Sequence, residues 1–547
     1  MFGFRDAFFY LIAFQVTLIK FLKKIYFTTN YYNKSLKSKI PNQVYFNPNS
    51  YLLSIISPYT NESFKVGEIN PNEFWLENKQ KNIAQHHNFL WLSLINRKTD
   101  GKNIQKIIYL WMLKYSNFKK TVWETSTLST RVISWLLNID IIINNGTFEF
   151  KKDFFQSIIL QCNHLKKNIR FEKDPLKKVE ILTALILSGI VFKEYENNYS
   201  SSIKDLEKFV KSYYDVDGYP LTRSTNDLIF VTKYLLICFE NIRDAQKYIP
   251  EFLDDLIKKN LACIKFFTTP NNQIPLFNGA SENSISNFDK YLANFKINKK
   301  GKTNPLGGIF YAKSKNQVLF FDVGGPPSKN FSKNYQSGPL SFEYFLDGLK
   351  IITNCGFGNN ISPKAELISR LTASQSTLTI NDTSITKFER NKLINRAFGN
   401  SIRDSFKTTK LEIKNNKNLI GCSVVHNGYE KNFSCIHQRE IYIDPENNKL
   451  KGIDHIFKKS DGLPIRYVFR FHLNPGLTAT KTMSGNSALI QISKTKSLIF
   501  TVKDENLEIE NSIYLGGRKI LDNTCITISG NLVNKDKSFN WEIKKKI

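Results

Sequence analysis

Apolar residues recur at helical spacing between about residues 50 and 300, with almost no strand-like alternation. Asp174 and Pro175 suit the start of one helix, as a capping residue and a proline in the first turn. Helices of this kind, joined by short polar loops, predict a stacked-hairpin array or an α/α toroid. The lack of a strict sequence period disfavours a regular repeat solenoid. The clearest helical runs cover residues 154–168, 179–193, 228–242 and 252–267.

Beyond about residue 303 the period of the pattern changes to two. Short β-prone runs separated by turn residues predict an antiparallel sandwich of two sheets. The predicted fold class is therefore multidomain, α then β: an N-terminal α/α toroid (incomplete helical barrel) followed by an antiparallel β-sandwich. We assign residues 1–45 to a basic amphipathic segment, 46–302 to the toroid and 303–547 to the sandwich. The predicted strands cover 318–323, 420–426, 435–444, 465–473, 497–503 and 511–517.

The stretch from Asn334 to Asp382 brings polar residues onto predicted paired strands. Residues 340–345 and 349–353 are apolar runs separated by Asp347-Gly348, a strong signal for a two-residue hairpin. If residues 377–380 lie beside this hairpin, five polar side chains converge on one patch. Alternatively, they are ordinary turn and edge residues of a sandwich. The five are Tyr335, Gln336, Glu343, Asn354 and Gln375.

An apolar run at residues 8–19 opens the chain and is followed by Lys20, Lys23 and Lys24. It is shorter than a membrane span, and it lacks the basic leader and small-residue cleavage site of a signal peptide. The pattern predicts an amphipathic helix, either at the inner face of a membrane or docked on the next domain.

Composition narrows the class of partner. The length of 547 residues suggests about two to four domains, and 41% hydrophobic residues are ample for packed cores. The net charge of +29 points to an anionic polysaccharide, nucleic acid or an anionic membrane surface, or else to lysines spread over an ordinary solvated surface. No nucleic-acid-binding motif is visible, so we expect no nucleic acid. The seven cysteines are scattered and predict neither disulfides nor a zinc finger.

Motifs in order along the chain resemble the heparinase II/III family of polysaccharide lyases and their bacterial relatives. In the helical half they are LSTRVISWL (128–136), ALILSGIVF (184–192), DGYPLTRS (217–224) and PLFNGASE (275–282). In the β half they are GPLSFEYF (338–345), SRLTASQSTL (369–378), HNGYE (426–430) and FRFHLNPG (469–476). The resemblance implies a helical toroid followed by a heparinase II/III-like C-terminal β-sandwich.

The resemblance also implies β-elimination on a uronic acid chain, such as a glycosaminoglycan or alginate. In the family a side chain neutralises the carboxylate, a Tyr or His removes the C5 proton, and an acid protonates the leaving oxygen. Carried over to this sequence, Lys177 or Arg223 neutralises the carboxylate, and Tyr335, with its pKa lowered by those cations, acts as base and acid. The substrate-binding residues would be Asp227, Gln336, Glu343, Asn354 and Gln375.

Several positions depart from the family's pattern. Its Asn-His pair falls at Leu176-Lys177 in an ungapped alignment, so we expect His164 to be a packed or surface histidine, and Asp227 stands at its Tyr position. Its metal-ligand positions fall at residues 334–338, Asn354 and Gln375 and carry neutral amides, which are poor zinc ligands, so we expect no metal and no other cofactor. The histidines expected to be satisfied structural residues are His426, His437, His455 and His472.

Two main functions stay open. One is a polysaccharide lyase acting on an anionic, uronic-acid-containing glycan. The other is a catalytically degenerate, glycan-binding relative in envelope polysaccharide metabolism, because amides bond to sugar hydroxyls but transfer no proton. A third function is a scaffold with peripheral membrane contact through residues 1–40. The resemblance implies the cell envelope or periplasm, and the lack of a visible cleavable signal leaves a cytoplasmic or inner-membrane-associated location as the alternative.

Overall fold

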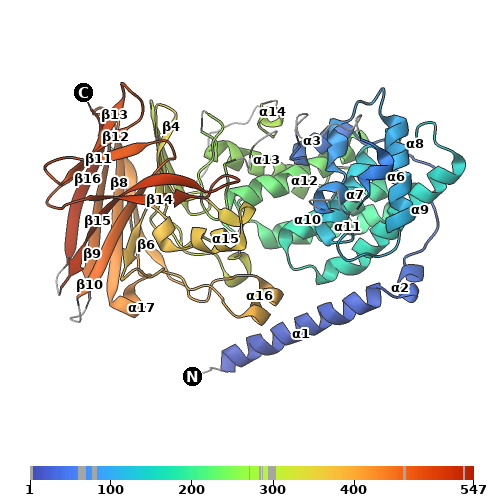
Figure 1. Ribbon diagram of the computed structural model, residues 1–547, viewed down its shortest axis with the longest axis horizontal. Helices are drawn as coiled ribbons and strands as arrows, with labels where there is room; N and C mark the ends of the chain where they lie inside the picture. Colours follow the sequence, from blue (N-terminus) through green and yellow to red (C-terminus); the bar gives the residue numbers. More distant parts are fainter. Residues whose placement is uncertain are drawn as a thin grey trace. The chain divides into compact units, whose positions relative to one another are not determined.

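The computed structural model describes residues 4–59, 69–76, 83–269, 271–282, 285, 288–293, 304–459, 464–533 and 536–546, shown in Figure 1. The chain divides into two compact units, each built from separate stretches of sequence. Unit 1 comprises residues 1–213, 230–261 and 287–296, and unit 2 comprises residues 214–229, 262–286 and 297–547. The predicted domain boundary between residues 302 and 303 lies outside the described residues.

Unit 1 is helical, as the sequence pattern predicts. The four helical runs found in the sequence correspond to α9, α10, α12 and α13, and the apolar run at residues 8–19 lies in α1. The first turn of α12 and the last residues of α13 belong to unit 2. The helices are α1 (Phe4–Phe27), α2 (Asn30–Ser35), α3 (Leu53–Ile56), α4 (Pro71–Phe74), α5 (Ile83–His87), α6 (Gly101–Tyr115), α7 (Thr125–Leu137), α8 (Ile139–Ile143), α9 (Phe148–Asn168), α10 (Pro175–Val191), α11 (Glu196–Tyr213), α12 (Thr225–Asp244), α13 (Glu251–Phe267) and α14 (Phe288–Leu292).

Local sequence explains where α10 begins. The Asp174 side chain accepts a hydrogen bond from the backbone N–H of Leu176 at 3.1 Å, and Pro175 occupies the first turn, where its missing N–H costs nothing. The apolar residues from Val179 to Val191 are buried. Among the described residues, the helices include none that is both long and apolar enough to cross a membrane.

Unit 2 holds two antiparallel sheets. Their strand orders are β1-β2-β3-β4-β10-β15-β14, with β5 also paired to β10, and β11-β12-β13-β16-β9-β8-β7-β6. The strands are β1 (Ile309–Ser314), β2 (Gln317–Asp322), β3 (Phe342–Leu346), β4 (Leu349–Thr353), β5 (Leu378–Ile380), β6 (Thr408–Asn415), β7 (Ile420–His426), β8 (Cys435–Asp444), β9 (Lys449–Lys458), β10 (Ile465–Leu473), β11 (Thr478–Lys481), β12 (Ser487–Gln491), β13 (Ser497–Val502), β14 (Glu508–Tyr514), β15 (Leu521–Leu532) and β16 (Lys537–Lys545). The helices of this unit are α15 (Pro363–Ser369), α16 (Lys392–Phe398) and α17 (Glu430–Phe433).

Aromatic rings from both sheets pack in the core of unit 2. Phe342 and Phe471 from one sheet contact Trp541 from the other, with ring centroids 5.5 and 5.0 Å apart. The predicted hairpin is present as β3 and β4, and Asp347 and Gly348 adopt the positive φ values that such a turn needs, 52° and 80°. The predicted order, helices followed by an antiparallel sandwich, is confirmed.

The segment at residues 377–380 differs from the sequence-based expectation. Its strand β5 pairs with residues 467–469 of β10, and the hairpin strand β4 pairs with residues 472–473 of the same β10. β5 and β4 therefore pair with successive parts of β10, and β5 is not paired with β4. Ser376 still joins the two, because its hydroxyl donates to the Thr353 carbonyl at 2.6 Å.

Candidate functional site

A polar cluster lies on three helices of unit 1. Glu124 caps α7: one carboxylate oxygen accepts from the backbone N–H groups of Ser126 and Thr127, at 3.0 and 3.1 Å. Its other oxygen pairs with Nζ of Lys177 on α10 at 2.5 Å, and both side chains are more than a third exposed. Burial lowers the pKa of Lys177, but the hydrogen bond and charge of Glu124 outweigh it and raise that pKa above its usual value. Lys177 is therefore a charged residue at the open side of the cluster.

Glu180 lies one turn further along α10 and is 3% exposed. Its Oε1 accepts hydrogen bonds from the Ser126 hydroxyl at 2.9 Å and from the Tyr234 hydroxyl of α12 at 3.1 Å. Its Oε2 has no hydrogen-bond partner among the residues that the structure describes. Burial raises the pKa of Glu180 to about 7, although both hydrogen bonds oppose the rise. A carboxyl with such a pKa gains and loses a proton near neutral pH, which is the property that proton-transfer chemistry requires.

Tyr234 completes the cluster as a proton donor. Burial and the neighbouring Glu180 raise its pKa well above the usual value. Its hydroxyl therefore keeps its proton while Glu180 titrates. Sequence reasoning selected Lys177 here but missed Glu124, Glu180 and Tyr234. The available signal was Glu180 itself, a single carboxylate in the apolar run VEILTALIL, three residues after Lys177 and so on the same helix face.

Arg223, in unit 2, is surrounded by its own chain. Its five N–H donors serve five oxygens: the Asp322 carboxylate at 2.5 Å and the carbonyls of Gly307, Gly308, Gly324 and Gly325 at 2.7 to 3.3 Å. A Cβ at Gly308 or Gly324 would come within 2.6 Å of the guanidinium, so the two Gly-Gly pairs leave the room that it needs. The predicted neutralisation of a substrate carboxylate requires a donor that Arg223 does not have in this arrangement. The side chain is suited to a structural role.

Tyr335 is fully buried near the same ion pair. The Arg370 guanidinium donates to its backbone carbonyl at 2.9 Å, and its hydroxyl has no hydrogen-bond partner among the described residues. Burial raises the pKa of Tyr335, Asp322 adds to the rise, and Arg223 opposes it. The pKa therefore moves in the direction opposite to the lowering that we expected from nearby cations, because loss of solvent outweighs the charge of Arg223.

The predicted amide residues meet at one carbonyl group. Gln336 and Gln375 both donate from Nε2 to the carbonyl oxygen of Ser369, each at 2.8 Å. Gln336 also accepts from the Gly279 N–H at 3.1 Å and donates to the Gly356 carbonyl at 2.9 Å. Both side chains are almost completely buried. Their hydrogen bonds connect loops of unit 2 to one another.

Asn354 and Glu343 continue this buried set. The Asn354 side-chain oxygen accepts from the Ser376 N–H at 3.0 Å, and the Asn354 N–H donates to Glu343 at 3.1 Å. The second oxygen of Glu343 pairs with Lys350 at 2.9 Å. Asp227, 2% exposed, lies in the first turn of α12, where its N–H donates to the Ser224 hydroxyl at 3.2 Å. The unit 2 residues of the predicted site thus contact their own unit, and Lys177 belongs to unit 1.

The histidines have structural surroundings. His164 is buried among aromatic rings and bonds to the Tyr32 hydroxyl at 2.7 Å, which makes it a packed histidine. In the sandwich, His426 bonds to His437 at 3.2 Å and His437 to Asp454 at 2.7 Å. His472 bonds to Ser512 and to the Ala373 carbonyl, and half-buried His455 lies 3.9 Å from Glu440. Among the described residues no group of three or more His, Cys, Asp or Glu side chains could hold a metal ion.

This chain is similar to a known protein family in sequence and to several solved structures in fold. Residues 296–542 match the family model described as Heparinase II/III-like, C-terminal. A solved structure of Heparinase III superposes with a TM-score of 0.68 at 15% identity, covering 97% of this chain and 91% of that chain. A mutant of the heparan sulfate lyase HepC from Pedobacter heparinus gives a TM-score of 0.66 at 14% identity, covering 94% and 87%. No match is found among curated protein sequences.

At these identities the structural likeness defines the fold, a helical toroid followed by a β-sandwich. The sequence match covers the sandwich and the residues just before it. The chain therefore carries a heparinase II/III-like C-terminal domain at residues 296–542, within a fold that matches heparinases along nearly its whole length.

Proposed function

We propose that the protein is a polysaccharide lyase that cleaves an anionic, uronic-acid-containing glycan by β-elimination. The heparinase II/III-like domain and the fold shared with a heparinase and a heparan sulfate lyase support this proposal. The net charge of +29 also supports it, because a basic surface attracts polyanions over a distance. Of the candidate glycans, a glycosaminoglycan and alginate both carry the required uronate.

The observation that carries the catalytic part of the proposal is the neighbourhood of Glu180 and Lys177 on α10. In β-elimination the C5–H bond breaks, its electrons form the C4=C5 double bond, and the C4–O bond breaks. We assign Lys177 to the substrate carboxylate, which would replace Glu124 as its partner and so stabilise the negative charge that develops. Glu180, with its pKa of about 7, takes the C5 proton on Oε2 and returns it to the leaving oxygen.

The direct test is the ultraviolet absorbance of the unsaturated uronate product. Purified protein is incubated with alginate, heparan-type and bacterial envelope polysaccharides, with and without added metal ions. We expect a rise in absorbance that Glu180→Gln eliminates. Tyr335→Phe discriminates between Glu180 and Tyr335 as the base that removes the C5 proton. Loss of turnover in this variant would indicate Tyr335 as the base, and retained turnover would support Glu180.

A second candidate is a glycan-binding relative without catalysis. The bonding of Arg223, Gln336 and Gln375 supports the absence of catalysis at these residues, since their donors are used by their own chain, and in this candidate other residues bind the glycan. It predicts glycan binding, measurable by titration calorimetry, with no absorbance change on any polysaccharide. For either function we propose a location in the cell envelope, to be checked by cell fractionation.

A further inference from the structure

The helix α1 exposes a continuous apolar stripe. Six large side chains follow the i, i+3, i+4 spacing of a single helix face and span about 100° of its circumference. Each is between 43% and 60% exposed. Large apolar side chains gathered on one exposed face indicate a surface that is covered in function. The six are Leu11, Phe14, Leu18, Phe21, Leu22 and Ile25.

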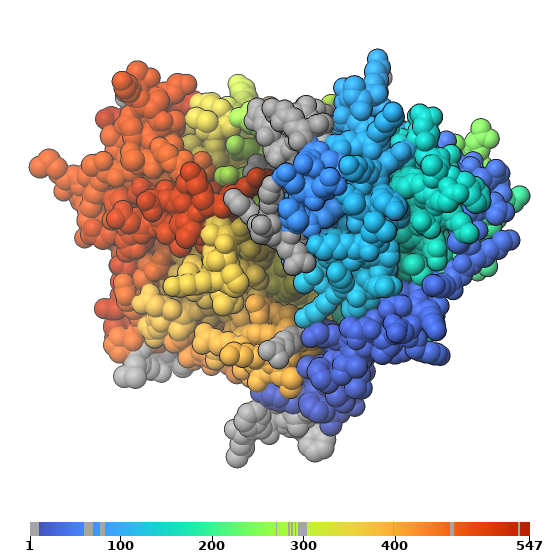
Figure 2. Space-filling view, turned by 45° about the vertical axis from the view of Figure 1, so that its right-hand side comes forward, coloured from blue at the N-terminus to red at the C-terminus, as the bar shows by residue number. Residues whose placement is uncertain are grey.

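The stripe is not the face by which α1 is attached to unit 1. Contacts of α1 with unit 1 include those at its C-terminal end, where Lys23 Nζ lies 3.0 Å from the ring centroid of Phe171 and Phe27 packs on Phe118 and His164 at 5.1 Å between ring centroids. Figure 1 shows α1 extending away from the other helices of its unit. In Figure 2 the dark blue atoms of this N-terminal segment are open to view.

Beyond Asp6, which lies in the first turn of α1, the charge of this N-terminal stretch has one sign. Between Asp6 and Glu62 the chain contains no acidic residue and six lysines. Lys20 and Lys24 are exposed and lie on the side of α1 away from the stripe. An apolar face with lysines on the opposite face is the pattern of helices that lie in the plane of a membrane surface. The six lysines are Lys20, Lys23, Lys24, Lys34, Lys37 and Lys39.

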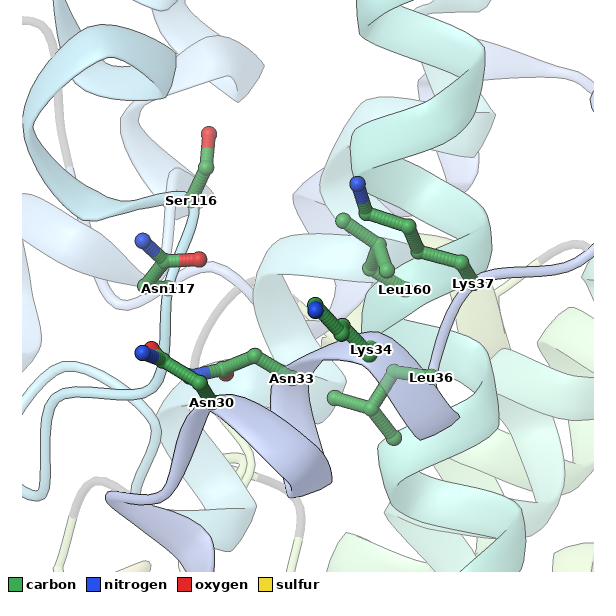
Figure 3. Close-up of a pocket in the computed structure, with 8 residues that line it drawn as sticks. All are labelled: Asn30, Asn33, Lys34, Leu36, Lys37, Ser116, Asn117 and Leu160. Carbon is green, nitrogen blue, oxygen red and sulfur yellow. The ribbon is translucent and has the colours of Figure 1, made fainter.

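A basic pocket of about 180 Å³ follows directly on α1 (Figure 3). It lies between α2, the residues after α6, and α9, and it contains the side chains of Lys34, Lys37, Asn30 and Asn117. Neither ammonium group has an ion-pair or hydrogen-bond partner among the residues that the structure describes. Two unpaired lysines with two amides in a partly enclosed space suit a phosphate group, because they supply charge and directed N–H donors.

We propose that residues 4–39 bind the protein to an anionic phospholipid surface, with the apolar stripe of α1 in the headgroup region and a lipid phosphate in the basic pocket. Tyr31, 73% exposed at the start of α2, adds an aromatic side chain of the kind that prefers this region. A second copy of the chain would cover the apolar stripe equally well. It would carry the same six lysines, however, so the charges would repel, whereas anionic headgroups complement them.

Vesicle co-sedimentation with the full chain tests the proposal. The probes are vesicles of phosphatidylcholine alone and vesicles in which part of it is replaced by phosphatidylglycerol. We expect binding to the anionic vesicles that weakens as salt is added, since salt screens the lysines. Absence of binding to anionic vesicles, or equal binding to both kinds at every salt concentration, overturns the proposal.

Two variants separate the two parts of the surface. Phe14→Ser combined with Leu18→Ser should weaken binding roughly tenfold or more, because two inserted apolar groups are removed. Lys34→Ala combined with Lys37→Ala should also weaken binding roughly thirtyfold, since each lysine near an anionic surface contributes about 1 kcal/mol. The matched controls are Leu113→Ser, at a side chain that is 68% exposed on α6, and Lys102→Ala on the same helix, which should bind like the unchanged protein.

Circular dichroism of each variant checks that the fold is kept. Equal loss in the controls would mean that binding depends on general surface properties, which contradicts the proposal. Light scattering covers the remaining alternative: a dimer that Phe14→Ser with Leu18→Ser converts to a monomer would assign the stripe to a second copy and would also overturn the proposal.

Discussion

The hydroxyl of Tyr234 donates to Oε1 of Glu180 across 3.1 Å, so a buried phenol on α12 supports a buried carboxyl on α10. Burial raises the pKa of that carboxyl to about 7. The folded protein therefore holds a proton on Glu180 up to a higher pH than the unfolded chain does.

This difference predicts how stability depends on pH. Because the folded pKa of Glu180 is above the unfolded one, the stabilising contribution is fully present below about pH 4.5 and is lost as pH rises through about 7. The loss amounts to about 3 kcal/mol. Glu180→Gln keeps an acceptor oxygen and cannot ionise, so its curve should lack this decline. Urea unfolding of the unchanged protein and of Glu180→Gln at a series of pH values measures how the free energy of unfolding depends on pH. Parallel curves for the two proteins would contradict the raised pKa of Glu180.

Lys177 should govern substrate binding in the proposed lyase. Lys177→Ala removes the cation that meets the substrate carboxylate and should lower kcat/KM roughly hundredfold or more. The matched control is Lys178→Ala, the adjacent lysine on α10, which should leave kcat/KM unchanged. Initial rates of product absorbance give both values. Equal effects of the two variants would show a general charge effect and not a specific contact.

Arg223 should be essential for folding of unit 2. Arg223→Ala leaves Asp322 buried without its partner and should cost about 3–5 kcal/mol. Arg466→Ala is the control, because Arg466 pairs with Asp382 at 3.1 Å where both side chains are more than half exposed, and its loss should cost less than about 1 kcal/mol. Urea unfolding followed by tryptophan fluorescence compares them. A similar cost for both would remove the structural role that we give to Arg223.

His472 should make the protein sensitive to acid. Burial lowers its pKa to about 4, so the unfolded chain, with an ordinary histidine, binds a proton at a higher pH than the folded protein does. Stability should therefore fall as the pH drops through about 6.5, by about 2 kcal/mol for this residue on reaching about pH 5. Urea unfolding of the protein and of His472→Gln at the two pH values named above measures how much of the loss in stability comes from His472. If the variant loses as much stability as the unchanged protein, the prediction is refuted.

The fold could be predicted from local pattern because periodicity reports it directly. The strands β7, β8 and β10 begin and end at the residues that alternation indicates, and Asp347-Gly348 makes the predicted hairpin turn. The pairing of β5 with β10 could not be read in this way, since alternation shows which face of a strand is buried but not which strand lies beside it.

The site was harder to predict because residue type does not reveal hydrogen-bond partners. Arg223 and Gln336 looked like ligands for a glycan, yet their donors are used by backbone carbonyls of loops far away in sequence. Glu180 was overlooked since its raised pKa comes from burial, which depends on α7 and α12 as well as on its own helix. In the sequence, the signal of such a residue is a lone carboxylate in an apolar run.

The division of unit 2 along the chain limits how the protein can be shortened. This unit includes residues 214–229 and 262–286 as well as everything from residue 297 onward. A fragment starting at residue 303 would contain the sandwich strands but would lack Arg223, the ion-pair partner of Asp322. It would also lack Gly279, whose N–H donates a hydrogen bond to the Gln336 side chain. During synthesis the early pieces of unit 2 emerge well before the strands that they join. Completion of this unit therefore waits until its last strand, β16, has been synthesised, and a fragment that starts at residue 303 is expected to be insoluble.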